Sequence, residues 1–137
     1  MTFGKSRYNK KYEYEIIRLA TLINNVVIGG CSKLFKHFIN KYKPSSVISY
    51  SDRRWFGEAT VYKTLGFTLL RTASPNYFYT KDYILLESRV KYQKHKLKKF
   101  LNFSNDLTEF ENMKNNGYDM IWDCGNDVWV WQNKVKV

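Results

Sequence analysis

Two adjacent glycines, Gly29 and Gly30, constrain the fold of this chain more than any other feature of its sequence. They follow a β-branched run at 26–28, which is typical of a strand, and precede apolar residues that recur at helical spacing over 30–43. Pro44 ends the predicted helix, and the apolar residues after it predict a buried strand. The order strand, glycine turn, helix and strand predicts a sheet flanked by helices.

The rest of the chain adds further strands and helices. Runs rich in aromatic and β-branched residues predict strands at 12–20, 67–73, 76–88 and 118–131. We expect the runs 67–73 and 76–88 to be antiparallel neighbours, and the turn at 123–127 to close a hairpin within the last run. Short helices are expected at 58–65, 89–101 and 106–116. The predicted fold class is α+β, with a mixed, mainly antiparallel sheet flanked by helices.

The length of 137 residues predicts a single domain, residues 1–137, that buries a core without disulfides or a structural metal. The two cysteines, Cys31 and Cys124, are far apart and form no metal-binding spacing, so we expect reduced thiols and no metal site. The chain has no apolar stretch long enough for a membrane span and no apolar signal-peptide core. We therefore expect a cytoplasmic protein without a membrane partner.

The charge balance indicates an anionic partner. The 23 Lys and Arg residues outnumber the 12 Asp and Glu residues, which leaves a formal net charge of +11. A surplus of one sign creates a field that attracts polyanions over about a Debye length, roughly 8–10 Å at moderate salt. Nucleic acid is the first partner to consider, although an acidic protein or an anionic surface satisfies the same field.

Basic residues next to aromatic residues are the candidates for nucleic-acid contacts, because guanidinium groups bind phosphates and aromatic rings stack on bases. They lie after the strand at 45–50, in the run 67–73 and in the basic segment 89–101. The candidates are Arg53, Arg54, Trp55, Arg71, Arg89, Lys91, Lys94 and Lys98. Alternatively, the basic segment is a solvated helix face and Trp55 packs in the core. Tyr77 and Tyr79 could form a stacking platform with Arg71, or they too could pack in the core.

The glycine turn has two interpretations. Free amides at the start of a helix attract an anion, so Ser32 and Lys33 behind the glycines indicate a phosphate site. Alternatively, the glycines only form a tight turn with positive φ.

The order of strand, glycine turn, helix and strand, followed by VYKTLGF, resembles the GNAT superfamily of acetyltransferases. Tyr62, Gly66 and Phe67 match a Tyr-x-x-x-Gly-Phe pattern common in that family, whereas Val26 and Cys31 depart from its usual loop. The resemblance implies that acyl-coenzyme A binds through its pyrophosphate at Gly29, Gly30, Cys31, Ser32 and Lys33. It also implies that Tyr62 donates a proton to the departing thiolate.

A second resemblance covers nearly the whole chain. The motifs VIGGCSKLFKHF, VISYSDRRW, YKTLGF, SPNYFY and GYDMIWDCGN, in this order, resemble the carboxy-terminal region of phage homing-endonuclease-like proteins. The resemblance implies DNA as a partner and the cytoplasm of an infected bacterial host as the location. The acidic residues show no spacing typical of a two-metal nuclease, so we expect no nuclease centre in this chain.

The sequence therefore predicts a phage-type DNA-binding accessory domain that binds the phosphate backbone through basic loops and a basic helix. Two alternatives stay open. One is a GNAT-like acyltransferase that uses acetyl-coenzyme A, and the other is a structural or host-protein interaction module. A homodimer, in which a second copy completes the sheet, is compatible with each of them.

Overall fold

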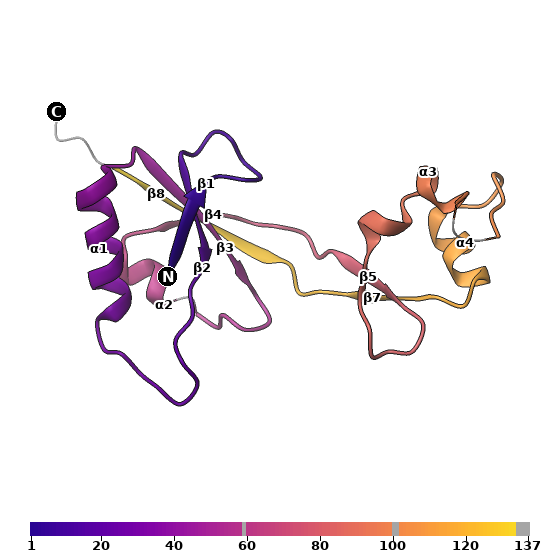
Figure 1. The fold of residues 1–137 in the computed structure, drawn as a ribbon, viewed down its shortest axis with the longest axis horizontal. Helices are drawn as coiled ribbons and strands as arrows, with labels where there is room; N and C mark the ends of the chain where they lie inside the picture. Colours follow the sequence, from indigo (N-terminus) through magenta and orange to yellow (C-terminus); the bar gives the residue numbers. More distant parts are fainter. Residues whose placement is uncertain (59, 100–101, 134–137) are drawn as a thin grey trace. The chain divides into compact units, whose positions relative to one another are not determined.

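The computed structural model describes residues 1–58, 60–99 and 102–133. The chain that we expected to form one domain contains two compact units (Figure 1). Unit 1 comprises Met1–Ser74 and Gly125–Val137, and unit 2 comprises Pro75–Cys124. The α+β fold class predicted from the sequence is confirmed, because each unit combines a sheet with helices.

Unit 1 is built on a five-stranded sheet with the strand order β1-β2-β3-β8-β4. The strands are β1 (Thr2–Lys5), β2 (Tyr14–Arg18), β3 (Ser46–Asp52), β4 (Thr68–Thr72) and β8 (Asn126–Gln132). β2 and β3 are parallel and the other pairs are antiparallel, as expected for a mixed, mainly antiparallel sheet. A parallel pair needs a crossover connection, and the helix after Gly29 supplies it.

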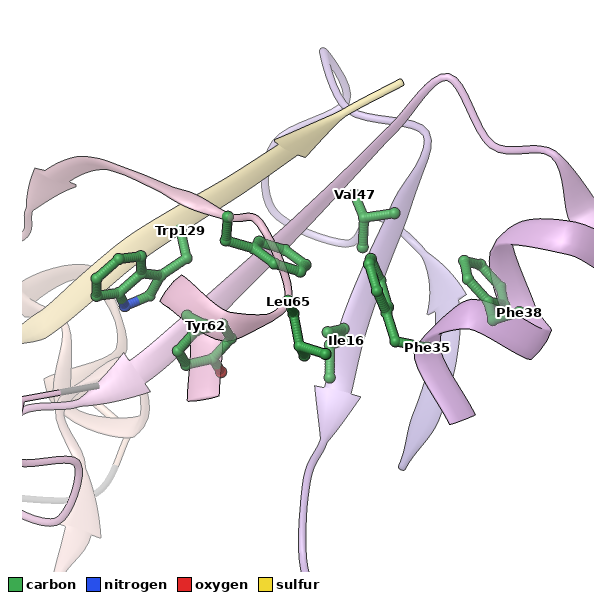
Figure 2. Packing of buried hydrophobic residues seen from close by; sticks show 8 residues of the cluster. Ile16, Phe35, Phe38, Val47, Tyr62, Leu65 and Trp129 are labelled. Atoms are coloured by element: carbon green, nitrogen blue, oxygen red, sulfur yellow. The ribbon is translucent and has the colours of Figure 1, made fainter. Parts of the chain in front are cut away.

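The helices of unit 1 are α1 (Gly30–Tyr42) and α2 (Thr60–Thr64). Gly29 precedes α1 with φ 69°, and Gly66 follows α2 with φ 81°, so each glycine has the left-handed backbone that other residues rarely adopt. Residues of both helices pack against the same face of the sheet (Figure 2). Phe35 and Phe38 come from α1, and Tyr62 of α2 stacks on Trp129 of β8 with ring centres 5.3 Å apart.

The other face of this sheet is covered by the loop 6–13. Tyr12 of this loop packs on a smaller buried cluster of Ile48, Val128 and Val130. Hydrogen bonds hold this loop, among them one from Ser6 N–H to Glu13 O at 3.3 Å.

Unit 2 contains a three-stranded antiparallel sheet with the order β6-β5-β7 and short helices. Its elements are β5 (Tyr77–Thr80), β6 (Glu87–Ser88), the 3-10 helix η1 (Arg89–Tyr92), α3 (Lys94–Leu97), α4 (Glu109–Asn115) and β7 (Asp119–Trp122). Its core is rich in tyrosine: Tyr79, Tyr92, Leu97, Met113 and Tyr118 are buried together. α4 begins with a capping box in which Thr108 and Glu111 satisfy each other's backbone N–H groups.

Two predicted strand pairings are wrong. β7 and β8 do not form a hairpin, because β7 pairs with β5 in unit 2 whereas β8 pairs with β3 and β4 in unit 1. The predicted neighbours 67–73 and 76–88 are separated in the same way, since β4 and β5 belong to different sheets. The reason is that the chain passes between the units at Ser74/Pro75 and at Cys124/Gly125, where the sequence signals look like those of ordinary turns.

Two predicted elements also differ. Residues 26–28 are an exposed loop rather than a strand, and β2, which ends at Arg18, is the strand that precedes α1. The basic segment 89–101 is divided between η1 and α3, with an extended Gln93 between them, and residues 100–101 lie outside the described residues. Within the described ranges, no helix is both long enough and apolar enough to cross a bilayer.

Candidate nucleic-acid interface

The positive charge of the chain is concentrated in unit 1. The residues of unit 1 include 15 of the 23 Lys and Arg and 5 of the 12 Asp and Glu, which gives a formal net charge of +10. The residues of unit 2 include the other 8 Lys and Arg and the other 7 Asp and Glu, which gives a formal net charge of +1. Because a polyanion responds to net charge, the electrostatic attraction for a polyanion is stronger at unit 1 than at unit 2.

A tight turn at the end of β3 presents three of the predicted contact residues. Asp52 fixes this turn, since its carboxylate accepts a hydrogen bond from Arg54 N–H at 2.8 Å and its carbonyl accepts from Trp55 and Phe56, each at 3.1 Å. Aspartate at the first position of a turn commonly bonds the backbone two residues later. The directions of the next side chains are therefore set by backbone geometry.

Trp55 is 74% exposed. The alternative interpretation of the sequence, in which Trp55 packs in the core, is therefore wrong. The guanidinium carbon of Arg54 lies 4.8 Å from the centre of the Trp55 ring, within the range of a cation–π contact. Arg53 Nε lies 3.8 Å from Asp127 Oδ1, and this ion pair joins the turn to β8. The turn thus combines two guanidinium groups with an exposed indole.

Arg71, on β4, is exposed on the same sheet. The stacking platform predicted from Arg71, Tyr77 and Tyr79 is divided between the units, because Arg71 belongs to unit 1 and both tyrosines belong to unit 2. Tyr79 is fully buried, and the hydroxyls of both tyrosines donate to Glu109 Oε1, at 3.0 and 3.1 Å. Burial, more than the nearby carboxylate, raises the pKa of Tyr79, and this phenol serves the core of unit 2.

The basic residues of unit 2 have local partners. Lys91 forms an ion pair with Glu87, and Lys94 Nζ donates to the carbonyl of Asn105 at 3.1 Å. Arg89 lies over the ring of Tyr77 at 4.7 Å, and Lys98 lies over the ring of Phe103 at 5.8 Å. Arg53 and Arg54 have local contacts of the same kind. We expect the cations of unit 2 to contribute less because unit 2 carries a net charge of +1 and unit 1 a net charge of +10.

The predicted cofactor residues surround the start of α1. A cavity of about 240 Å³ opens there, lined by Gly30 and Cys31 together with apolar side chains such as Leu19 and Leu34. Gly30 N–H donates to Val27 O at 3.1 Å within the turn, and Lys33 N–H donates to Gly29 O at 3.0 Å where α1 begins. Ser32 and Lys33 are exposed.

A second cavity of about 270 Å³ lies beyond the point where β2 and β3 stop pairing. Their register ends at Ile16 and Ser49, while both strands continue, and the cavity is lined by the ends of both strands, by Trp55 and by Tyr62. Leu19 lines both cavities.

Tyr62 is buried in the wall of this second cavity. Its hydroxyl lies 2.8 Å from Ser49 Oγ, which explains how a buried phenol is satisfied. Burial raises the pKa of Tyr62, and the hydrogen bond with Ser49 offsets part of that rise. Ser49 was not among the site residues predicted from the sequence. The alternation of side chains along β3 places Ser49 on the same face as Val47 and Ser51, and this signal could have identified it.

Two acidic residues at the ends of the segment 123–127 accept hydrogen bonds from residues that are distant in the sequence. Asp127 Oδ1 accepts from Thr72 Oγ1 at 2.7 Å, and Asp123 Oδ1 accepts from Asn76 N–H at 2.8 Å. Among the described residues, no three His, Cys, Asp or Glu side chains gather as they would around a metal ion. Comparison of the chain with protein-family models, with curated proteins and with solved structures gives no match.

Proposed function

We propose that the protein is a DNA-binding accessory domain, related to phage homing-endonuclease-like proteins, that binds the phosphate backbone without a nuclease centre of its own. The observation that carries this proposal is the exposed Trp55, which lies under the Arg54 guanidinium in a turn that Asp52 holds. An exposed indole next to two arginines is suited to stacking and to bidentate phosphate contacts. The net charge of +10 on unit 1 supports the same partner.

In this proposal Arg53, Arg54 and Trp55 provide the principal contact and Arg71 adds a further positive charge on unit 1. Arg89, Lys91, Lys94 and Lys98 of unit 2 contribute general attraction. Contacts to phosphate carry no sequence information, so the proposal predicts affinity for DNA with weak sequence preference.

The experiment compares two double variants that remove equal charge. Fluorescence anisotropy with a labelled 20-base-pair duplex measures the Kd of the wild type, of Arg53→Ala/Arg54→Ala and of Lys94→Ala/Lys98→Ala. We expect the arginine variant to bind about tenfold or more weakly, and the lysine variant to lose clearly less. Equal losses in both variants would show that only total charge matters and would contradict the assignment to the turn.

One specific observation favours a second candidate, an acyltransferase that uses acyl-coenzyme A. The cavity at the glycine turn and the cavity beside Tyr62 have Leu19 as a common lining residue. A ligand with a phosphate near Lys33 and a thioester near Tyr62 would extend along both, and a phenol with a raised pKa stays protonated at neutral pH, as a general acid must.

Isothermal titration calorimetry with coenzyme A and acetyl-coenzyme A tests this candidate. Saturable binding that Lys33→Ala weakens, together with acetyl transfer that Tyr62→Phe abolishes, would support it. The absence of a binding heat at millimolar ligand would rule it out.

A further inference from the structure

The loop 6–13 presents one aromatic side chain to solvent from an ordered backbone. Ser6 Oγ donates to Asn9 O at 2.7 Å, Tyr12 N–H donates to Asn9 O at 3.2 Å, and Lys11 N–H donates to Asn9 Oδ1 at 3.1 Å. Lys10 Nζ donates to Ser6 O at 2.7 Å, and Tyr12 packs on the sheet. These bonds fix both ends of the loop around its exposed middle.

Glu15 anchors the loop to β2. Its side chain is 1% exposed, its Oε1 lies 2.6 Å from Arg7 Nη2, and its Oε2 accepts from Arg7 N–H at 3.0 Å. A buried carboxylate that loses such a partner is left with an uncompensated charge, so the contact is maintained strongly. Arg7 is therefore held in place, and so is the residue that follows it.

That residue is Tyr8, which is 77% exposed. The guanidinium carbon of Arg7 lies 5.3 Å from the Tyr8 ring centre, and the Tyr50 ring meets it edge to face at 5.9 Å. These neighbours fix the orientation of the ring but cover little of it. The ring is therefore available for stacking by a ligand, with little conformational entropy left to lose.

The charges around Tyr8 indicate which ligand stacks on it. Lys10 and Lys11 belong to the same loop and are exposed. Burial raises the pKa of Tyr50, and the positive charge of Arg71 offsets part of that rise. An exposed ring with Arg7 against it and further cations in the same loop suits a nucleobase that is attached to phosphate. A base can stack on a side chain only where it is not stacked inside a duplex.

We propose that the loop 6–13 binds an unpaired nucleotide, with a base stacked on Tyr8 and its phosphates near Lys10 and Lys11. Single-stranded DNA, or a bulge or frayed end within duplex DNA, is then the preferred ligand of unit 1. This inference rests on the proposed DNA binding of unit 1 and names its substrate class.

The experiment uses the full chain, with 12-nucleotide single-stranded DNA, the same sequence as RNA and the matching duplex, at one salt concentration. The wild type is compared with Tyr8→Ala, with Tyr8→Phe, which keeps the ring, and with Tyr42→Ala, which removes an exposed aromatic residue from α1. Circular dichroism and thermal unfolding establish that each variant is folded. In a separate assay, 2-aminopurine in the single strand measures stacking on the wild-type protein.

We expect the wild type to bind single-stranded DNA more tightly than the duplex, and Tyr8→Ala to weaken single-strand binding about fivefold to a hundredfold. Tyr8→Phe and Tyr42→Ala should bind within about twofold of the wild type, and the fluorescence of 2-aminopurine should change on binding. Comparable affinity for RNA would support the proposal, because the base and the phosphates that it assigns to the loop are common to RNA and DNA.

Three results would overturn the proposal. If single-stranded binding is unchanged in Tyr8→Ala, or falls no more than duplex binding does, the stacking contact is absent even though unit 1 binds DNA. If 2-aminopurine does not respond to the wild-type protein, no base is stacked. If no oligonucleotide binds at low salt, the proposed DNA-binding function fails as well. This result differs from a failure of the stacking contact alone, in which DNA still binds.

Discussion

The hydroxyl groups of Tyr62 and Ser49 lie 2.8 Å apart in unit 1 and join α2 to β3 through a buried hydrogen bond. The Tyr62 ring also stacks on Trp129, so one residue connects a helix to two strands of the sheet. The cavity beside the Trp55 turn is lined by this pair.

Replacement of Tyr62 by Phe should lower the free energy of unfolding by about 1 kcal/mol, because the ring is kept and only one hydrogen bond is lost. Tyr62→Ala should cost about 3–5 kcal/mol, as expected for removal of a buried aromatic ring. Urea unfolding followed by circular dichroism measures both losses. Tyr42→Phe, on an exposed ring, serves as the control and should change stability by less than about 0.5 kcal/mol.

Gly29→Ala should destabilise unit 1 by about 1–2 kcal/mol. The cost is conformational, since φ is 69° and a Cβ at this position would meet no atom within 4 Å. Gly29→Asn should cost less, because asparagine tolerates the left-handed region. Thermal unfolding of the two variants provides the comparison, and equal losses would argue against a left-handed residue at this position.

Thr108→Ala should weaken α4 by about 1 kcal/mol, because it removes the side chain that accepts from Glu111 N–H at 3.2 Å. Thr108→Ser keeps the hydroxyl and should retain most of the stability. Hydrogen exchange of the α4 amides is the suitable measurement, since it reports on this helix alone. Similar protection in the alanine and serine variants would contradict the capping box.

Glu13 makes the stability of unit 1 depend on pH in the acid range. Hydrogen bonds from Ser45 N–H at 2.8 Å and Ser45 Oγ at 3.0 Å lower the pKa of Glu13 below its ordinary value of 4.5. A carboxyl with a lowered pKa in the folded state contributes stability above the unfolded pKa and loses it as the pH falls through the folded pKa. The stability difference between the wild type and Glu13→Gln should therefore be present at pH 7 and shrink below about pH 4.5. Denaturation over pH 3–7 measures it, and a difference independent of pH would contradict this assignment.

The local elements could be predicted from the sequence, whereas their pairing could not. The helical spacing before Pro44 predicted α1, and the short helix expected at 58–65 corresponds to α2. Spacing is a property of neighbouring residues, but the partner of a strand is set by distant ones. The run that contains Trp122 and Val128 therefore looked like one hairpin, although its halves belong to different sheets.

The candidate interface was predicted in part. Arg53, Arg54 and Trp55 are adjacent in sequence, so their meeting in one turn needed no tertiary information. The Tyr8 loop was missed because its order depends on the burial of Glu15, which a single sequence does not reveal. The separation of charge between the units was hidden for the same reason, since the chain returns to unit 1 at β8.

The salt dependence of DNA binding by the wild-type protein tests the central claim most directly. The Kd for a 20-base-pair duplex is measured by fluorescence anisotropy at several salt concentrations between 50 and 200 mM. If unit 1 neutralises about four phosphates, the logarithm of the association constant should fall linearly with the logarithm of salt concentration, with a slope of about −3.6. A Kd that does not change with salt, or no binding at 50 mM, would contradict the proposal that this protein binds the DNA backbone.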